Sequence, residues 1–343
     1  MEDEIKRKLA KIVNIDSVNV HSNADSLELA MIGGWQVVIR KGEFKAGDVA
    51  VYFEVDSWVP TELAPFLSKG KEPREYCGVK GEKLRTIRLR GELSQGLLLP
   101  ITIKQELSLL EPGSDVTELL GVLKYEPPIP ACLAGVQKGN FPATIRKTDC
   151  ERIQNLNRSL EQWIESEMTW EVSEKIDGTS VTFALIDGEF IVCSRNINLV
   201  EDKQNLYWKT AREYEIEQRM RAYNLDGYAL QGEIYGNSVQ GNKYNLNQTY
   251  LALFTVQSNG NFLTPIERQD LLTKMALPQA PIFNYVSFKF KPGDTIKKIL
   301  EAADGKSVLG TTGTLREGLV FKSTDGKEIV KAVSNAWLEK FKD

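Results

Sequence analysis

Residues 8–100 contain many short segments in which apolar and polar positions alternate with a period of two, as in half-buried strands. Glycine, asparagine and aspartate separate these segments and are typical turn residues. Because the strands are few and short, we expect a small β-barrel rather than a sandwich. The expected strands are Lys8–Val18, Leu27–Ile32, Gln36–Arg40, Val49–Glu54, Lys83–Leu89 and Gly96–Pro100.

The pattern changes in the second half of the chain, where helical spacing alternates with hairpins. Antiparallel hairpins mixed with helices indicate an α+β fold rather than the regular βαβ order of a doubly wound sheet. Helices are expected at Leu156–Glu167, Asp202–Tyr223, Glu267–Met275 and Thr295–Ala302. Strands are expected at Thr169–Lys175, Ser180–Ile186, Glu189–Ser194, Tyr228–Ile234, Tyr250–Val256, Gly318–Phe321 and Glu328–Val333.

The segment from Tyr125 to Pro130 separates these two patterns. Its three prolines fit neither a helix interior nor a central strand. A chain of 343 residues is also long for a single core. We therefore expect a β-barrel domain over residues 1–125, a proline-rich linker over 126–140 and a second domain over 141–343.

Composition excludes several classes of protein. The hydrophobic share of 42% and charged share of 26% are ordinary for a soluble chain, and no apolar run reaches a membrane span. The first residues lack the apolar core of a signal peptide. We therefore expect a cytoplasmic or nuclear protein without membrane attachment. We also expect a monomer. The cysteines are scattered, and His21 is the only histidine, so chemistry that needs two histidines is excluded.

The strongest candidate for chemistry is the run Glu174-Lys175-Ile176-Asp177-Gly178, which places an amine and a carboxylate where a strand meets a turn. Alone, it also fits an ordinary hairpin with a solvated lysine. Further groups follow in order: Ser194-Arg195-Asn196, Gly232-Glu233-Ile234-Tyr235-Gly236, the strand around Phe254, Glu317-Gly318-Leu319-Val320, and Val330-Lys331. Lys331 lies within an apolar strand and requires an anion, unless that strand is an edge exposed to solvent.

This ordered series resembles the motifs of the covalent nucleotidyltransferases, which include polynucleotide ligases and RNA capping enzymes. It most resembles the ATP-dependent RNA ligases that carry an N-terminal OB-like domain. The resemblance covers essentially the whole chain, including residues 21–30 and the lead-in around residues 141–155. It implies an N-terminal OB-like β-barrel and a C-terminal antiparallel-sheet nucleotidyltransferase domain of the ATP-grasp-like ligase type.

The resemblance also implies an activity. Such an enzyme joins a 3′-hydroxyl and a 5′-phosphate of RNA, as in RNA repair, through a lysyl-AMP and an AMP-capped RNA. Lys175 becomes the nucleophile toward ATP, and Lys331 the second catalytic lysine, which contacts phosphate. Deprotonating a free lysine at pH 7 costs about 4.6 kcal/mol. We expect a nearby metal ion and Lys331 to lower the pKa of Lys175.

The remaining roles follow from the same resemblance. The cofactors are ATP and Mg²⁺ or Mn²⁺, and the acids bind the metal directly or through water. The acids expected around the metal are Asp177, Glu233 and Glu317. The residues expected to contact the nucleotide are Glu174, Lys175, Arg195, Glu233, Phe254, Glu317, Val320 and Lys331. An ordinary core aromatic is the alternative for Phe254, and Glu233 also fits a contact with the ribose.

RNA binding is expected from a basic segment of the first domain and from Arg152. Five cations and one carboxylate between residues 80 and 90 give a local charge of +4. The RNA-binding candidates are Lys83, Arg85, Arg88, Arg90 and Arg152. Trp35, Tyr52, Phe53 and Trp58 are candidates for base stacking. The alternative is a solvated strand edge over a barrel core that contains the aromatic residues.

Two other functions remain open from the sequence. DNA ligases and capping enzymes share these motifs, but they usually carry an OB domain after the last one, and here 12 residues follow Lys331. A non-catalytic RNA-binding protein on a ligase scaffold is the other alternative. One departure from the family is Val333, where some RNA ligases carry another lysine; Lys322 is a candidate substitute for its phosphate contact.

Overall fold

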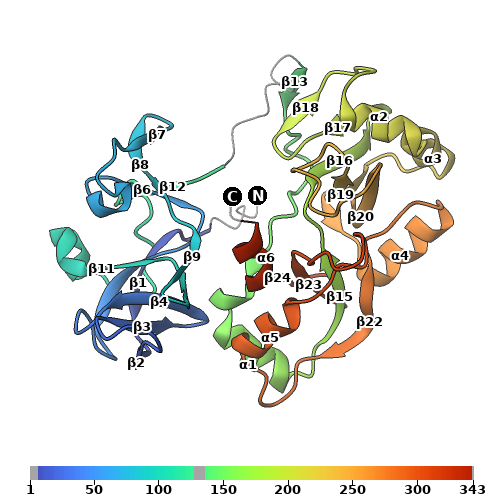
Figure 1. Cartoon of the computed structure of the whole chain (residues 1–343). Coiled ribbons are helices and arrows are strands. Elements are labelled where there is room, and N and C mark those ends of the chain that lie inside the picture. The colour runs from blue at the N-terminus through green and yellow to red at the C-terminus, as the bar shows by residue number, and fades with distance from the viewer. Residues whose placement is uncertain (1–6, 127–135, 342–343) are drawn as a thin grey trace. The chain divides into compact units, whose positions relative to one another are not determined.

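The computed structural model describes residues 7–126 and 136–341, and the chain divides into two compact units (Figure 1). Unit 1 comprises Met1–Pro127 together with Gln154–Asn157, and unit 2 comprises Pro128–Ile153 and Arg158–Asp343. Most of the proline-rich linker expected over residues 126–140 lies outside the described residues. Within the described residues, no helix is long and apolar enough to cross a lipid bilayer.

Unit 1 is built from short antiparallel strands in four small sheets, ordered β1-β5-β11, β2-β3-β4, β12-β6-β8-β7 and β10-β9. Three short 3-10 helices, η1 (Pro65–Ser68), η2 (Ile101–Ile103) and η3 (Gln105–Leu109), join them. The strands are β1 (Ala10–Asn14), β2 (Ser17–Val20), β3 (Leu27–Ile32), β4 (Trp35–Arg40), β5 (Val49–Phe53), β6 (Ser57–Pro60), β7 (Arg74–Tyr76), β8 (Val79–Lys83), β9 (Thr86–Leu89), β10 (Glu92–Gln95), β11 (Leu97–Pro100) and β12 (Leu123–Lys124).

Strand β5 forms the centre of unit 1, because its alternating side chains enter two different cores. Val51 and Phe53 pack in one apolar cluster, and Ala50 and Tyr52 pack in the other. Two of the expected strands are broken. The expected strand Lys8–Val18 is divided into β1 and β2, and Lys83–Leu89 contains the end of β8 and all of β9.

The segment Gln154–Asn157 reaches unit 1 although it follows the linker in sequence. Asn155 accepts hydrogen bonds from Trp35 Nε1 at 2.7 Å and Lys11 Nζ at 3.2 Å. Its own amide donates to Glu54 Oε2 at 2.9 Å, and Glu54 is fully buried. A buried carboxylate is costly unless it is hydrogen-bonded, so Asn155 completes this core from a distant part of the chain.

Unit 2 contains two sheets. One has seven strands in the order β13-β18-β17-β16-β19-β20-β21, and the other has five in the order β14-β24-β23-β15-β22. Their strands are β13 (Gln137–Asn140), β14 (Glu151–Arg152), β15 (Thr169–Lys175), β16 (Thr179–Ile186), β17 (Glu189–Cys193), β18 (Ile197–Leu199), β19 (Tyr228–Gly236), β20 (Thr249–Ser258), β21 (Asn261–Phe262), β22 (Ile282–Lys289), β23 (Gly318–Ser323) and β24 (Ile329–Val333).

Helices cover both sheets of unit 2 (Figure 1). Side chains of α2, α3 and α4 share one apolar cluster with β16, β19 and β20. On the other sheet, Trp163 of α1 packs edge-on against Trp170 of β15. The α-helices are α1 (Asn157–Glu165), α2 (Leu206–Glu213), α3 (Ile216–Ala222), α4 (Pro265–Lys274), α5 (Ile296–Ala303) and α6 (Asn335–Lys340). The 3-10 helix η5 (Ile153–Asn155) lies mostly in the segment that belongs to unit 1.

The single helix predicted over residues 202–223 is wrong, because α2 ends at Glu213 and α3 begins at Ile216. Glu215 lies between them with φ 51°, a left-handed conformation. The side chain of Arg219 donates to the carbonyl oxygen of Tyr214 at 3.1 Å. An exposed carbonyl at a helix end needs such a donor, so a side chain from the next helix stabilises the break.

Candidate active site

Lys175 is the last residue of β15 and lies opposite Gly318 of β23. Its Nζ donates to Glu317 Oε1 at 2.6 Å. The two side chains are 23% and 16% exposed, so the ion pair is shielded but accessible. A Cβ on Gly318 would lie 2.2 Å from the carbonyl oxygen of Ala332. Only glycine therefore allows β23 to begin this close to β24, next to the acid.

The protein's own side chains raise the pKa of Lys175 above its usual value. Burial acts to lower this pKa, but the charge and hydrogen bond of Glu317 and the charge of Glu233 together outweigh it. The expected lowering of the pKa of Lys175 is therefore wrong as far as the protein's own side chains are concerned. They hold Lys175 as an ammonium ion.

Asp177 follows two residues after Lys175, in the turn that leaves β15. Its Oδ1 accepts from Lys243 Nζ at 3.1 Å, and its backbone N–H donates to the hydroxyl of Tyr244 at 2.8 Å. Burial and the charge of Glu317 raise the pKa of Asp177 to about 6, although Lys243 opposes the shift. The segment containing residues 243 and 244 therefore fixes both the backbone and the carboxylate of Asp177.

Glu233 lies in β19, opposite Ser180 of β16 and Ala252 of β20. Burial raises the pKa of Glu233 to about 8, against the opposing charge of Lys175. Gly178 allows the preceding turn to approach this strand, because a Cβ there would lie 2.3 Å from Ile234 O and 2.8 Å from Glu233 Cγ. The motif glycine thus brings the turn of one sheet against the acid of the other.

This group of acids contains two buried oxygens, Asp177 Oδ2 and Glu317 Oε2, with no hydrogen-bond partner among the described residues. Buried polar atoms are nearly always satisfied, and carboxylate oxygens suit Mg²⁺ and Mn²⁺. Among the described residues, no three His, Cys, Asp or Glu side chains are grouped closely enough to hold an ion alone. The donors therefore fit a cation that completes its coordination with water and phosphate oxygens.

Lys331 lies on the same face of the five-stranded sheet as Lys175. Lys331 pairs with Val320 across β23–β24, and Val320 pairs with Ser173 across β15–β23. Directly paired residues share a face, as do alternate residues of one strand. Strand β24 is flanked by β14 and β23, so it is not the solvent-exposed edge that the alternative required.

Phe254 lies at a break in the regular pairing of β19 with β20, where Gln231 and Gly232 face Thr255 and Leu253. Such irregularities turn a side chain away from the usual alternation. The ring is partly buried and packs on an apolar cluster that includes Ile176, the neighbour of Lys175. This position suits both a stacking ring and a core aromatic, the two interpretations left open by the sequence.

Glu174 has a structural environment that the sequence did not indicate. Its side chain is 2% exposed. One oxygen accepts from the hydroxyl of Ser307 and the other from the backbone N–H of Val308 at 3.1 Å. Burial raises the pKa of Glu174, and these hydrogen bonds oppose the shift. Its role as a contact to adenine stays a prediction.

Arg195 is exposed and donates to Asp149 Oδ1 at 2.7 Å. Its charge acts to lower the pKa of Glu233, which brings it within electrostatic reach of the acids. Lys147 Nζ donates to the neighbouring Asn196 Oδ1 at 3.2 Å. The lead-in segment before α1 is therefore held against the loop that carries Arg195.

Comparisons with known proteins agree with this geometry. The RNA ligase family model matches residues 168–333. A solved structure of Naegleria gruberi RNA ligase, a mutant with ATP and Mn, is 41% identical and covers 98% of this chain and 100% of its own, with a TM-score of 0.89. This chain belongs to the RNA ligase family. Structures of the same relative with pyrophosphate and, as a mutant, with AMP and Mn align with the same identity and coverage, at TM-scores of 0.89 and 0.90.

The N-terminal part of this RNA ligase family member also has a match, since an OB-fold domain model aligns with residues 9–101. The expected OB-like domain and α+β class are thus confirmed. The comparison with curated protein sequences finds no match.

The aromatic residues suggested for base stacking in the OB domain are not available. Trp35, Tyr52, Phe53 and Trp58 are each at most 2% exposed, so they form the barrel core, as the alternative stated.

The basic segment of the OB domain is only partly free to bind RNA. Lys83 is 12% exposed on its side chain, lies 3.7 Å from Asp56 Oδ1 and lies 4.7 Å from the ring centre of Tyr125. Lys80 pairs with Glu72 at 3.2 Å. Arg85, Arg88 and Arg90 are exposed. The local charge of +4 is reduced by acids that are distant in sequence.

Two predicted phosphate contacts of the ligase domain are buried. Arg152 is 7% exposed, and its strand β14 pairs with β24 at Lys331. Lys322 donates to the carbonyl oxygen of Phe254 and to Thr255 Oγ1, the latter at 3.0 Å. Burial, aided by the charge of Arg268, lowers the pKa of Lys322 to about 7. Its suggested role as a substitute phosphate contact does not agree with this internal bonding.

The sequence interpretation missed Lys243 and Tyr244, which contact Asp177 directly. They lie between β19 and β20 in a stretch rich in asparagine and glycine, where no hydrophobic period marks a functional residue. The one available signal is the position of this loop in the chain. It follows β19, the strand that carries Glu233, and connects it to β20, which runs back beside β19.

Proposed function

We propose that this chain is an ATP-dependent RNA ligase that joins 3′-hydroxyl and 5′-phosphate RNA ends through a lysyl-AMP on Lys175 and an AMP-capped RNA, in RNA repair. One observation carries the proposal: Lys175 Nζ lies 2.6 Å from Glu317 Oε1, beside Asp177 and Glu233, at the end of a rigid strand. Family membership supports the same interpretation.

In the first step, the lone pair of Lys175 Nζ attacks the α-phosphorus of ATP. A P–N bond forms, the bond to the bridging oxygen of the β-phosphate breaks, and pyrophosphate leaves. The amine must first lose its proton, and the attraction of Glu317 opposes that loss. Releasing Glu317 from Lys175 is therefore part of activation.

Asp177, Glu233 and Glu317 are the residues that would hold Mg²⁺ or Mn²⁺, partly through water. The ion supplies positive charge, which neutralises the α-phosphate and favours the neutral amine of Lys175. In the relative, structures contain ATP and Mn together.

The nucleotide is held by groups on the same face and around it. Lys331 contacts the α-phosphate and stabilises its developing negative charge. Val320 and Phe254 enclose the adenine, Glu174 reads its edge and Arg195 contacts the ribose or the RNA end.

The two later steps need RNA at the same site. The AMP passes from Lys175 to a 5′-phosphate, and a 3′-hydroxyl then displaces AMP to form the phosphodiester. Arg152, on strand β14 of the five-stranded sheet, contacts the RNA backbone. The basic segment of the OB domain, which contains Lys83, Arg85, Arg88 and Arg90, also binds the RNA backbone.

Adenylylation is tested by incubating the protein with α-labelled ATP and Mg²⁺ or Mn²⁺, followed by a denaturing gel. We expect label on the wild-type chain and none on Lys175→Ala. Lys209→Ala removes an exposed lysine of α2 and should label normally. An unlabelled wild type would favour a non-catalytic RNA-binding protein.

The preference for RNA is tested separately with nicked duplexes that carry RNA or DNA on the 3′-hydroxyl side. We expect faster sealing with RNA. Equal rates would refute the RNA assignment while leaving adenylylation intact.

A further inference from the structure

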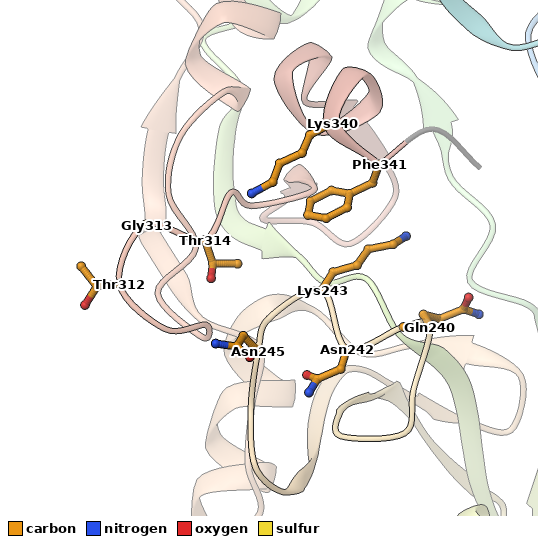
Figure 2. Close-up of a pocket in the computed structure, with 10 residues that line it drawn as sticks. Gln240, Asn242, Lys243, Asn245, Thr312, Gly313, Thr314, Lys340 and Phe341 are labelled. Atoms are coloured by element: carbon orange, nitrogen blue, oxygen red, sulfur yellow. The ribbon is translucent and has the colours of Figure 1, made fainter.

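A hollow lined by Lys243, the partner of Asp177, opens between the loop after β19, the loop before β23 and the C-terminal helix (Figure 2). It has a volume of about 680 Å³, within the range of ordinary ligand sites. Of the ten described residues that line it, none is acidic and two are lysines. The lining residues are Gln240, Gly241, Asn242, Lys243, Asn245, Thr312, Gly313, Thr314, Lys340 and Phe341.

Aromatic and cationic groups meet on one wall of this hollow. Phe341 packs against Trp337 with ring centres 4.3 Å apart. Lys340 Nζ lies 5.0 Å from the ring centre of Phe341, and Lys243 Nζ lies 5.6 Å from it. In Figure 2 both lysines extend beside this ring. A ring flanked by cations is the combination with which proteins bind a base and its phosphate.

The opposite wall supplies neutral hydrogen-bonding groups. Thr312 and Gly313 are exposed at the tip of the loop before β23, and Asn245 is exposed on the loop after β19. Hydroxyl and amide groups can donate to phosphate or sugar oxygens without a desolvated charge. The lining therefore suits a polar anion and disfavours an apolar ligand.

The hollow is joined to the reactive centre by direct contacts. Lys243 lines it and pairs with Asp177 at 3.1 Å. The next residue, Tyr244, is buried; its hydroxyl accepts from the backbone N–H of Asp177 at 2.8 Å, and its carbonyl oxygen accepts from Thr311 N at 3.1 Å. A ligand that contacts Lys243 in the hollow would therefore touch a residue that is bonded directly to Asp177, in the turn that follows the nucleophile.

We propose that this hollow binds one nucleotide unit of the RNA substrate next to the reacting ends, with its phosphate at Lys243 and Lys340 and its base against Phe341. The inference rests on the proposed RNA ligase function. The triphosphate tail of ATP offers the same phosphate chemistry, so the experiment must separate the two sources. RNA is favoured because an aromatic ring accompanies the cations and accepts a base.

The test uses the full chain with Lys340→Ala and Thr312→Glu, two exposed substitutions that leave the core intact. RNA binding is measured by fluorescence anisotropy with a labelled single-stranded RNA across a salt series. We expect Lys340→Ala to weaken binding roughly fivefold and to reduce the log–log salt slope by about 0.7, the loss of one phosphate contact. Thr312→Glu should weaken binding at least as much through repulsion.

Lys274→Ala is the matched control, since it removes an exposed lysine of α4 that does not line the hollow. Its RNA affinity and salt slope should equal those of the wild type. The rate of Lys175 labelling and the KM for ATP should be unchanged in Lys340→Ala and Thr312→Glu, and sealing by both should need more RNA.

Two results would overturn the inference. Unchanged RNA binding by both variants would remove the RNA site, and a raised KM for ATP with normal RNA binding would assign the hollow to the triphosphate. A wild-type chain that is never labelled by ATP would instead refute the proposed function, and RNA binding could still be compared among the variants.

Discussion

Lys175 and Lys322 lie on the same face of the same sheet, on the adjacent strands β15 and β23, but the protein treats them in opposite ways. The pKa of Lys175 is raised, because Glu317 and Glu233 outweigh its burial. Burial and Arg268 lower the pKa of Lys322 to about 7. A search for the more easily deprotonated amine would therefore select Lys322.

Access decides between the two amines. Lys322 is bonded to Phe254 and Thr255 within the fold, whereas Lys175 is 23% exposed beside acids with unsatisfied oxygens. A lowered pKa marks a nucleophile only where a substrate can reach the amine. Burial and the charge of Arg268 explain the lowered pKa of Lys322, and the nucleophile is the lysine whose partner can be exchanged.

The acids beside these lysines differ in the same way. Glu171 is fully buried and both of its oxygens accept from Arg268, each at 2.7 Å. Glu317 has one oxygen on Lys175 and one without a partner among the described residues. Both oxygens of Glu171 are satisfied within the fold, whereas Glu317 keeps capacity for a ligand. Breaking each pair should therefore affect different properties.

The largest expected effect is on stability, from Glu171→Ala. The substitution leaves Arg268 buried without its carboxylate, which costs about 3–5 kcal/mol in the free energy of unfolding. Urea denaturation measures this loss. The control is Asp270→Ala on the same helix as Arg268, which breaks an exposed pair with Lys274 and should cost less than about 1 kcal/mol. Equal effects from both substitutions would contradict the structural role of the buried pair.

Glu317→Gln should have the opposite pattern of effects, with a large loss of labelling and a small loss of stability. We expect the rate of Lys175 labelling by ATP to fall by about 100- to 1000-fold, because the substitution removes one of the three carboxylates that would hold the metal ion. The pair is partly exposed, so stability should change by less than about 1 kcal/mol. Single-turnover labelling and urea denaturation are measured on the same samples. Glu328→Gln, an exposed acid before β24, serves as the control, and labelling of Glu317→Gln at the wild-type rate would refute the role of Glu317.

The sequence predicted the local elements best where the alternation is strong. Strands β3 and β15 have the bounds expected from the pattern, and the motif residues 175, 177, 233 and 317 gather at one site. Strand β22 was missed although Ile282–Lys289 alternates regularly between half-buried and exposed positions. It pairs with β15 at the edge of the sheet, a contact that no local pattern encodes.

The partners of charged residues could not be predicted from the sequence. Lys83 meets Asp56, Lys243 meets Asp177, and Arg268 meets Glu171, which is 97 residues away. Such pairs depend on the register of strands that are distant along the chain, so a local count of charges overestimates what a segment offers to RNA. The pKa of Lys175 was expected to fall through a metal ion and Lys331, whereas Glu317 and Glu233 of the chain itself raise it.

Gly178→Ala tests whether the two sheets must approach each other this closely at the site. The added methyl would meet Ile234 O at 2.3 Å and Glu233 Cγ at 2.8 Å, so backbone or acid must shift. Overpacking of this kind costs about 1–3 kcal/mol, and the displaced acid should also slow labelling. Thermal unfolding and labelling kinetics report the two effects. Gly139→Ala, with no atom of the described residues within 4 Å of its new methyl, should change neither quantity.

The smallest expected effect is a pH dependence of stability from Lys322. Its pKa is about 7 in the folded chain, against 10.5 for an unperturbed lysine. Between these values the unfolded chain binds the extra proton, so this residue makes stability rise with pH. As pH falls from 10.5 to 7, this contribution of Lys322 to the free energy of unfolding is progressively lost, and below pH 7 it is absent.

Lys322→Met removes the titrating amine from this buried position. The wild-type free energy of unfolding minus that of Lys322→Met should therefore grow from pH 7 to pH 9 in urea titrations. Lys327→Met replaces a lysine that is 81% exposed, so the same difference should stay flat across this range. A flat difference for Lys322→Met as well would mean that Lys322 keeps its proton in the fold. In that case Glu171 would neutralise two cations, and the contrast with Lys175 would then rest on access alone.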